Sequence, residues 1–448
     1  PMKRLPIILA ALLCGGAYAQ TEPLTLDACL RLAQENNKAL AAAERQAQAA
    51  QFDLRSMKGN FFPSLSATGV GLYSTSDGRL DIAGGSLPVL DKNGVPTGST
   101  AYFPGLGLDY SLGWIYGGGV TLEQPLYMGG KVRTGYRMAR IGSSLAAENR
   151  RLTEAEVIVE TSRAYAGVVR AREIRRVAES YRRLLAELLR SVESARRHGI
   201  QPQNDVLKVR VKFNESELDL RRAENALRLA TMNLCHYIGC PLGTPLDVAG
   251  DLPEPPAAAA PGTGDMTARP EYRMLAGKSD LAREQMRLAR SERLPQIGLA
   301  GNYGYLHGLE VNGQNLLGSW GFSAGIRLSV PIFHFGTRSN RFRSARAKYE
   351  QAQAELESGG ELLALEMTQA ANNLDEALLE RRLADTSMEA AEENLRMSRR
   401  QYEAGLETLS DYLEAQAVWQ QASRTQVEAR IGSYLRWLEY RKAAGLLD

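Results

Sequence analysis

Long apolar runs are missing from this 448-residue sequence after residue 20. A helix that spans a membrane needs about eighteen or more consecutive apolar residues, and no such stretch is present. Aromatic residues make up only 7% of the chain and the formal net charge is +3, so no basic surface for nucleic acid is indicated. For a secreted chain, these absences leave a soluble protein, a peripheral protein or part of a β-barrel.

Histidine is scarce as well, which bears on enzymatic function. The four histidines are His198, His236, His307 and His334, and their spacing matches no metal-binding pattern. The sequence contains neither a phosphate-binding loop nor a nucleophile elbow. We therefore predict that the chain is not an enzyme and that it needs no metal and no cofactor.

The N-terminal segment has the pattern of a secretory signal. Lys3 and Arg4 precede an apolar run at 5–13, and the small-residue stretch Ala17-Tyr18-Ala19 follows. The apolar run is too short to cross a bilayer of about 30 Å as a helix, which argues against an N-terminal anchor. The pattern predicts a signal peptide at 1–19.

Cysteine is limited to four residues, one of which, Cys14, lies in the predicted signal. Cys29, Cys235 and Cys240 would then remain in an oxidising compartment. Cys235 and Cys240 are near enough in sequence to pair as a local disulfide. Cys29 stands among leucines, which favours a buried thiol.

The chain repeats itself internally. Residues 119–126 align with 325–332 at an offset of 206, and the same offset carries Gly199 onto Gly405 and Asp205 onto Asp411. Upstream, 62–65 aligns with 294–297 at an offset of 232, so the first repeat holds a loop that is 26 residues longer. We expect a first structural repeat at 20–240, a Pro/Ala-rich linker at 241–268 and a second repeat at 269–448.

Alternation with a period of two predicts two strands in each repeat. Apolar residues share one face at Leu108, Tyr110, Leu112, Trp114 and Tyr116, and again at Trp320, Phe322, Ala324, Ile326, Leu328 and Val330. The stretches 297–305 and 65–73 follow the same rule, and the loops 75–107 and 306–319 are expected to lie outside. A lipid-facing barrel wall around a wet lumen gives this pattern, but so does a half-buried sheet in a soluble protein.

Long helices are the second feature of each repeat. Residues 131–197 contain no proline and predict a helix of about 100 Å, and 337–402 predicts a partner of equal length that Gly359-Gly360 interrupts. The chain then returns along helices at about 203–237 and 408–441. Helices this long must pack side by side as coiled coils. A purely structural coiled-coil rod would have the same helices.

Four strands cannot close a barrel, because even the smallest barrels need about eight. An open edge that faces lipid would leave unpaired backbone groups that cost several kcal/mol each. A barrel therefore requires other copies of the chain.

The sequence from about Leu24 to Gly445 resembles the TolC-type outer-membrane efflux family. The resemblance is carried by the opening LTLDACL at 24–30 with ENN at 35–37, by QPLYMGGK at 124–131, by its echo VPIFHFG at 330–336, and by the hairpin tips. It implies an α+β membrane protein in which each chain contributes four strands to a trimeric twelve-stranded barrel on a tunnel of antiparallel helices. Prolines then mark the barrel-to-helix junctions, at Pro63, Pro125, Pro295 and Pro331.

The resemblance also implies a gate at one pair of helix ends. The tip YEAGLE at 402–407 is similar to the family's inner hairpin, so Tyr402 would bond Asp205 of the other hairpin to hold a closed state. Asp411 and Glu414 would form acidic rings that select cations and respond to pH. Glu407 is a departure, because the best-known member of the family has at this point an arginine that helps lock the aperture. Acids in the first turn of a helix are also favoured by the helix dipole alone.

The hairpin tips Gly199-Ile200 and Gly405-Leu406 resemble the motifs that meet an adaptor protein, although glycine there is equally explained by helix termination. The implied partners are two further copies of the chain, a periplasmic adaptor (membrane fusion) protein, an inner-membrane pump and outer-membrane lipid. The implied location is the outer membrane with a periplasmic extension. The implied function is a passive exit duct, in an efflux pump or a type I secretion system, for small molecules or polypeptides. The alternative is a secreted structural coiled-coil protein without a pore.

Overall fold

The structure is a computed structural model that describes residues 23–256, 265–308, 310–315 and 318–447. The signal expected at 1–19, with Cys14, lies outside these residues, as does the 257–264 part of the linker. The chain divides into a helical unit (1–48, 145–276 and 354–448) and a sheet unit (49–144 and 277–353). No helix among the described residues is both long enough and apolar enough to cross a membrane.

The element order includes the predicted long helix and returning helix of each repeat, and helices also precede the first strand of each. The helices are α1 (Leu26–Asn36), α2 (Lys38–Gly59), α3 (Lys131–Arg197), α4 (Gln203–Ile238), the short 3₁₀ helix η1 (Met266–Ala268), α5 (Pro270–Ser291), α6 (Thr337–Glu403) and α7 (Leu409–Ala443). Both long helices, α3 and α6, contain 67 residues, and their ends differ by the offset of 206 found in the sequence. The two repeats therefore build the same long helix, in each case from a sequence that contains no proline.

One feature of α6 differs from the expectation. The helix runs through Gly359-Gly360 without interruption. A Cβ atom at Gly359 would lie 2.4 Å from Cδ1 of Leu275 on α5. The glycine therefore gives α5 room to pack closely on α6, and the helix does not break there.

The helical unit buries its core where α1, α3, α4 and α7 meet. This core includes Cys29, Tyr165, Leu234 and Tyr434, all of which are buried. The break between α1 and α2 is set by Asn37, whose side chain accepts hydrogen bonds from the N–H groups of Ala39 (2.9 Å) and Leu40 (3.3 Å). An Asn at this position caps the start of the next helix.

The first part of the linker is tied to the N-terminal segment. Leu24 forms a parallel bridge with Val248. The Arg172 side chain on α3 donates to the carbonyl oxygen of Val248 at 2.5 Å, and the N–H of Gly250 donates to the Tyr165 hydroxyl at 3.1 Å. The segment after the first repeat is thus fixed onto α3.

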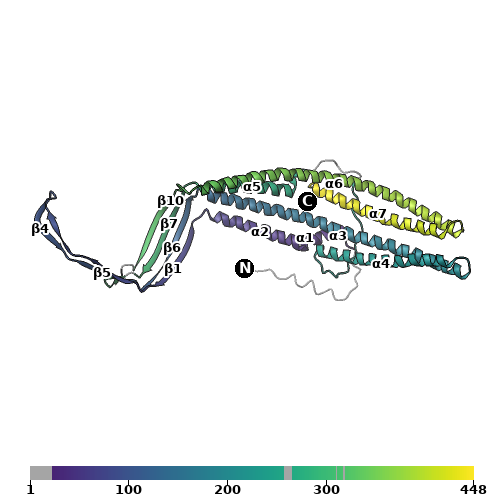
Figure 1. The fold of residues 1–448 in the computed structure, drawn as a ribbon, viewed down its shortest axis with the longest axis horizontal. Helices are drawn as coiled ribbons and strands as arrows, with labels where there is room; N and C mark the ends of the chain where they lie inside the picture. The colour runs from purple at the N-terminus through teal and green to yellow at the C-terminus, as the bar shows by residue number, and fades with distance from the viewer. Residues whose placement is uncertain (1–22, 257–264, 309, 316–317, 448) are drawn as a thin grey trace. The chain divides into compact units, whose positions relative to one another are not determined.

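Four antiparallel strands form the main sheet of the sheet unit, in the order β1-β6-β7-β10 (Figure 1). Their bounds are β1 (Ser64–Tyr73), β6 (Trp114–Tyr127), β7 (Gln296–His307) and β10 (Ser319–Ser329). Three of them match the strands predicted at 65–73, 297–305 and 320–330. The strand predicted at 108–116 divides between β5 (Leu106–Ser111) and the start of β6, and most of β6 was not predicted as a strand. Within the described chain, the outer edges of β1 and β10 have no strand partner.

The predictions of loops at 75–107 and 306–319 are wrong in one respect, because most of the first segment and part of the second form strands. The additional strands are β2 (Asp77–Ile82), β3 (Gly85–Leu90), β4 (Pro96–Phe103), β5 (Leu106–Ser111), β8 (Glu310–Val311) and β9 (Gln314–Asn315). They form a second sheet in the order β2-β5-β8-β9 and a separate β3-β4 ribbon. The β8-β9 turn is Asn312-Gly313, with φ of 50° and 73°, as a two-residue hairpin of type I′ requires.

Candidate channel wall and gate

The register of the main sheet separates an apolar face from a face of small and polar residues. Directly paired residues lie on the same face, and the pairs Tyr73↔Trp114, Val120↔Tyr303 and Tyr303↔Phe322 place large side chains together. The other face carries Ser66, Thr68, Gly117, Gly119, Asn302, Gly304, Ser323 and Gly325, and toward the end near Trp114 it also carries Val70, Leu72, Ile115 and Leu306. The apolar side chains on the first face are exposed in the single chain.

Aromatic rings gather at one end of the apolar face. Tyr303 stacks on Trp320 with ring centroids 5.2 Å apart, and Tyr73 lies 5.2 Å from Trp114. Tyr116 lies 4.7 Å from His307 in the same group. A band of aromatic residues at the rim of an apolar wall is typical of strands that cross a bilayer, where the rings sit at the interface with water.

The four junction prolines lie at or near strand ends. Pro63 and Pro295 directly precede β1 and β7, and Pro331 follows the end of β10. Pro125 lies inside β6, paired with Gly298, and the register shifts between Pro125 and Tyr127. A register shift accommodates a residue that has no backbone N–H to donate.

Two helices of the helical unit expose apolar stripes. Leu207, Val211, Leu218 and Leu229 are exposed on α4, and Leu362, Leu365, Leu379 and Leu383 are exposed on α6. The spacings of four, seven and eleven residues on α4, and of three, fourteen and four residues on α6, keep each set on one side of its helix. Such stripes are the seams through which coiled-coil helices meet a partner helix.

The two hairpins end in the same cap. Gly199 and Gly405 have φ of 76° and 71°, the left-handed region that favours glycine. The N–H of Ile200 donates to the Ala195 oxygen at 3.0 Å, and the N–H of Leu406 donates to the Gln401 oxygen at 2.9 Å. This six-to-one bond is a Schellman motif, so helix termination accounts for both glycines.

The apolar residue after each glycine is not explained by the cap. A Schellman motif usually buries this residue against the last turn of its helix. Here Ile200 is 75% exposed and Leu406 is 81% exposed. The tips therefore present two apolar side chains to the solvent.

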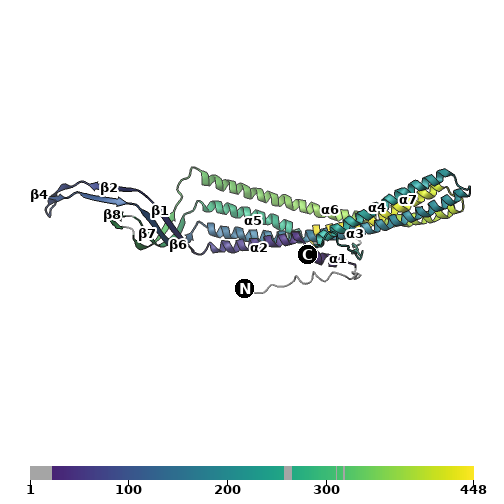
Figure 2. The same ribbon diagram turned by 90° about the horizontal axis from the view of Figure 1, so that it is seen from below.

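A compact cluster joins the α3-α4 hairpin to the α6-α7 hairpin near the tips. Its buried members are Leu188, Val192, Val206, Val209, Leu409 and Tyr412. Figures 1 and 2 show the four helices side by side in this part of the helical unit. Tyr402 packs against the cluster and stacks on Tyr412, with ring centroids 5.1 Å apart.

Tyr402 and Asp205 lie near each other, but within the described chain no hydrogen bond joins them. Burial raises the pKa of Tyr402 above its ordinary value, and the charge of Asp205 adds to the shift. Asp205 itself pairs with Lys208 at 3.6 Å. The bond expected between Tyr402 and Asp205 remains a prediction.

Asp411 has a local role that a gate would not require. Its Oδ2 accepts a hydrogen bond from the Thr408 hydroxyl at 2.6 Å, and its N–H donates to the Thr408 Oγ1 at 3.3 Å. This capping box stabilises the start of α7. Asp411 and Glu414 are both exposed and, three residues apart, lie on one face of the helix.

The structure adds buried polar groups at the tips that the sequence did not suggest. The side chain of Gln416 on α7 is fully buried, and neither of its polar atoms has a hydrogen-bond partner in the structure. The Ser398 hydroxyl and one carboxylate oxygen of Glu407 are also buried without a hydrogen-bond partner among the described residues. At the offset of 206, the corresponding positions of the first repeat are Val192 for Ser398, Gln201 for Glu407 and Arg210 for Gln416. Arg210 differs from Gln416 in that it is exposed and pairs with Glu193 at 2.6 Å.

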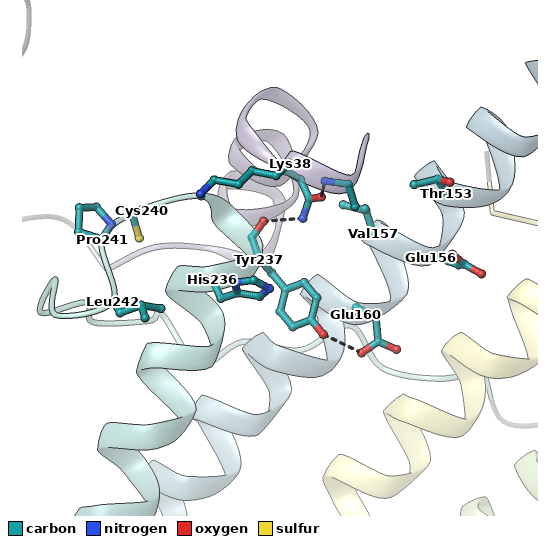
Figure 3. A pocket seen from close by; sticks show the side chains of 13 residues that line it. Lys38, Thr153, Glu156, Val157, Glu160, His236, Tyr237, Cys240, Pro241 and Leu242 are labelled. Atoms are coloured by element: carbon teal, nitrogen blue, oxygen red, sulfur yellow. Dashed lines mark hydrogen bonds between the residues drawn. The ribbon is translucent and has the colours of Figure 1, made fainter. Parts of the chain in front are cut away.

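A pocket of about 680 Å³ lies beside the start of α2 (Figure 3). Its hydrogen bonds run from the Asn37 amide to the Tyr237 carbonyl oxygen at 3.1 Å and from the Tyr237 hydroxyl to Glu160 at 3.4 Å. His236 and Lys38 also line it. Within the described residues, no group of three or more His, Cys, Asp or Glu side chains could hold a metal ion. The visible role of these residues is to tie α2, α3 and α4 together.

Cys235 and Cys240 stand at the end of α4, near this pocket. In the structure Cys29, Cys235 and Cys240 are free thiols. Burial raises the pKa of the Cys235 thiol to about 11, and a hydrogen bond with Cys240 adds to the shift. The N–H of Cys240 donates to the Cys235 oxygen at 3.0 Å, so the two residues lie next to each other, and their pairing as a disulfide remains a prediction.

Comparison with known proteins identifies the family. The profile of the outer membrane efflux protein family matches residues 29–240 and 267–445. The outer membrane protein TolC of Vibrio cholerae is 23% identical over 74% of this chain and 76% of its own length. The proteases secretion protein PrtF of Dickeya chrysanthemi is 24% identical over 100% of this chain and 93% of its own length.

Solved structures have the same fold. The CmeC outer membrane channel of Campylobacter jejuni superposes with a TM-score of 0.77 at 19% identity, covering 94% of this chain and 85% of its own. The outer membrane protein VceC of Vibrio cholerae gives 0.75 at 16% identity, covering 94% and 96%. Since the family profile matches both repeats, this chain belongs to the outer membrane efflux protein family.

Proposed function

We propose that this chain is one of three identical subunits of a passive exit duct, which crosses the outer membrane and extends into the periplasm. The observation that carries the proposal is the main sheet: it has one aromatic, apolar face, one face of small and polar residues, and two edges without a partner. A wall with these two faces separates lipid from a wet lumen.

Three copies are needed to complete this wall. Four strands are too few to enclose a lumen, and the edges of β1 and β10 cannot stay open in lipid. The exposed apolar stripes on α4 and α6 also require partner helices, because apolar stripes of this length are unfavourable in water. Neighbouring copies supply both the missing strands and the missing helices.

The rival function is a secreted coiled-coil protein whose sheet never enters lipid. That protein would leave Trp114, Tyr303, Trp320, Phe322 and Ile326 on one wet surface. Membranes washed with alkaline carbonate distinguish the two functions, because a barrel remains in the membrane fraction and a peripheral protein is released. A gel mobility that shifts on heating would further support the barrel.

We also propose a gate where the α6-α7 hairpins of the three copies meet. Asp411 and Glu414 would form two acidic rings around the axis, and contact between Tyr402 and Asp205 would hold the aperture closed. The proposal is supported by the exposure of both acids on one face of α7 and by the nearness of Asp205 to Tyr402. Rings of carboxylates attract cations and make a pore cation-selective.

Conductance of the purified trimer in planar bilayers tests both the pore and the gate. Because Asp411 caps α7, we choose Asp411→Asn with Glu414→Gln, which removes the charges and keeps a capping oxygen. We expect a conducting wild type whose preference for cations falls in the variant, while Glu224→Gln, on α4 far from the tips in sequence, leaves it unchanged. A wild-type trimer that does not conduct would contradict the duct, and an unchanged ion preference in the double variant would contradict the gate.

The partners we propose are a periplasmic adaptor protein and, through it, an inner-membrane pump. Ile200 and Leu406 would be the contact points, since both side chains are exposed at tips whose caps do not require this exposure. An apolar side chain at the end of a rigid hairpin can fill a pocket on a partner and anchor the contact.

A further inference from the structure

The β2-β5-β8 segment of the second sheet, which we call the arm, separates apolar from charged residues. Its pairs Leu80↔Leu108 and Ile82↔Leu106 lie on one face, together with Tyr110 and its partner Val311. The opposite face carries Asp77, Arg79, Asp81, Asp109, Ser111 and Glu310. Arg79 pairs with Asp81 at 2.7 Å and with Asp109 at 3.7 Å, so the charged face is suited to water.

The apolar face of the arm is uncovered in the single chain. Leu80 is 57% exposed, Leu106 46%, Ile82 44% and Tyr110 42%. A contiguous exposed patch of this kind marks a surface that meets another apolar phase or a partner.

This face continues the apolar face of the main sheet. The backbone ladder runs through the connection, because the N–H of Ser74 donates to the Gly113 oxygen and the N–H of Leu112 donates to the Ser76 oxygen, both at 2.9 Å. Thr75, in the connection from β1 to β2, is one residue more than the opposite strand has between Leu112 and Gly113. The partner strand has no insertion, so Tyr110 and Leu112 share the face of Trp114. A bulge of this type bends the sheet.

The arm cannot lie inside the hydrocarbon of the membrane. From Leu122 to the aromatic band at Trp114, β6 rises about 26 Å along the strand at about 3.3 Å per residue. A tilted wall of this length already spans most of the apolar band of a barrel, which is about 25 Å tall. The aromatic rings mark its outer limit, and the arm begins beyond them.

Only one direction of bend satisfies both faces. Bent inward over the lumen, the arm would turn its apolar face to the external water. Bent outward, it turns the same face down onto the membrane and the charged face up to the water. Pairing with a neighbouring copy through the edges of β2 or β9 would leave the apolar face uncovered in either case, because edge pairing does not cover a face.

We infer that the arm lies on the outer surface of the membrane, with Leu80, Ile82, Leu106 and Tyr110 against the lipid of the outer leaflet. The inference rests on the proposed barrel in the outer membrane. The arm is an amphipathic β-ribbon that makes the same kind of contact as an interfacial amphipathic helix, whose apolar side is buried at the boundary of headgroups and acyl chains.

Photo-crosslinking of the trimer in dioleoylphosphatidylcholine vesicles tests this inference. Benzoylphenylalanine replaces Ile82 on the apolar face of the arm or the adjacent Asp81 on the charged face. The matched barrel positions are Phe322 on the lipid face and Ser323 on the lumen face. Lipid adducts are measured by mass spectrometry, and heat-shifted mobility on gels shows that each variant is assembled; Leu80 provides a second apolar position.

We expect lipid adducts at Ile82 similar to those at Phe322 and severalfold above those at Asp81 and Ser323. Adducts at Ile82 no higher than at Asp81, with Phe322 still reacting, would overturn the inference and leave the barrel standing. A crosslink from Ile82 to a second copy of the chain would also overturn it. Absence of lipid adducts at Phe322 would overturn the barrel and the inference together.

Discussion

At the residue scale, Arg269 is the most deeply buried charged side chain of the described chain. Its guanidinium, 2% exposed, donates to Glu366 at 2.8 Å, to Glu271 at 3.2 Å and to the carbonyl oxygen of Ala443 at 3.1 Å. It therefore ties the start of α5 to α6 and to the end of α7. Nothing in the sequence distinguished it from the other arginines, because two of its partners, Glu366 and the Ala443 oxygen, come from distant segments.

Replacement of Arg269 by alanine should destabilise the helical unit by about 3–5 kcal/mol, since it leaves a partly buried carboxylate without its partner. Thermal unfolding of the helical signal measures the change. Arg283→Ala, which removes an exposed pair with Asp280, should cost about 1 kcal/mol or less. Equal losses in the two variants would contradict the role of Arg269.

The same site predicts a pH dependence. Burial would raise the pKa of Glu271, but the hydrogen bond from Arg269 outweighs it and holds the pKa below its ordinary value. A carboxyl with a depressed pKa in the folded state contributes stability above its unfolded pKa and loses it as the pH falls through the folded value. The difference between wild type and Arg269→Ala should therefore be largest at neutral pH and shrink in acid.

The contact between Cys235 and Cys240 leads to a prediction about redox state. In an oxidising compartment the two thiols should pair. Counting reactive thiols after unfolding without a reductant measures this, and the mature chain should show one, from Cys29. Three reactive thiols in protein isolated from the periplasmic side would rule the disulfide out.

At the element scale, glycines 359 and 360 in α6 differ in their surroundings. A Cβ atom at Gly360 would lie 3.8 Å from the Tyr272 ring, an ordinary contact, whereas at Gly359 it would press on Leu275. Gly360→Ala should therefore stabilise the helix by about 1 kcal/mol. Gly359→Ala should stabilise the helix clearly less, because the Leu275 side chain must move. In a protein that already carries Leu275→Ala, Gly359→Ala should stabilise the helix as much as Gly360→Ala does. Equal effects of the two glycine variants in thermal unfolding would mean that α5 does not pack closely at Gly359.

The elements differ in how far the sequence could predict them. The bounds of the long helices were predicted to within about two residues. Each helix is a long stretch without proline, and the offset of 206 places the same helix ends in both repeats. The main strands followed from alternation. Strands β2 to β4 were missed, because their Gly, Ser and Pro content is typical of loops and their only signal is short alternation, such as Arg79-Leu80-Asp81-Ile82.

The packing of the hairpin tips could be predicted only in part from the sequence. The sequence indicates which residues stand at the tips, and the repeat indicates that the two hairpins match. Whether Asp411 caps its own helix, and whether Gln416 is buried without a partner, depends on packing between hairpins that no local pattern encodes.

At the scale of the whole molecule, the exposed tips predict a docking contact. Leu406→Glu should abolish crosslinking to the periplasmic adaptor in cells and leave the heat-shifted trimer intact, because a charge cannot enter an apolar pocket without a partner. Leu406→Met, which keeps the apolar volume, is the matched control. Unchanged crosslinking of the Leu406→Glu variant would show that the adaptor docks elsewhere.

The unfinished sheet also has a genetic consequence. Because a subunit with two open strand edges functions only beside its copies, a defective allele does more than remove its own product. A cell that expresses normal and gate-defective chains together would build mostly mixed assemblies, and few would consist of normal chains alone. Variants that still assemble should therefore be dominant, whereas variants that cannot pair their edges should be recessive.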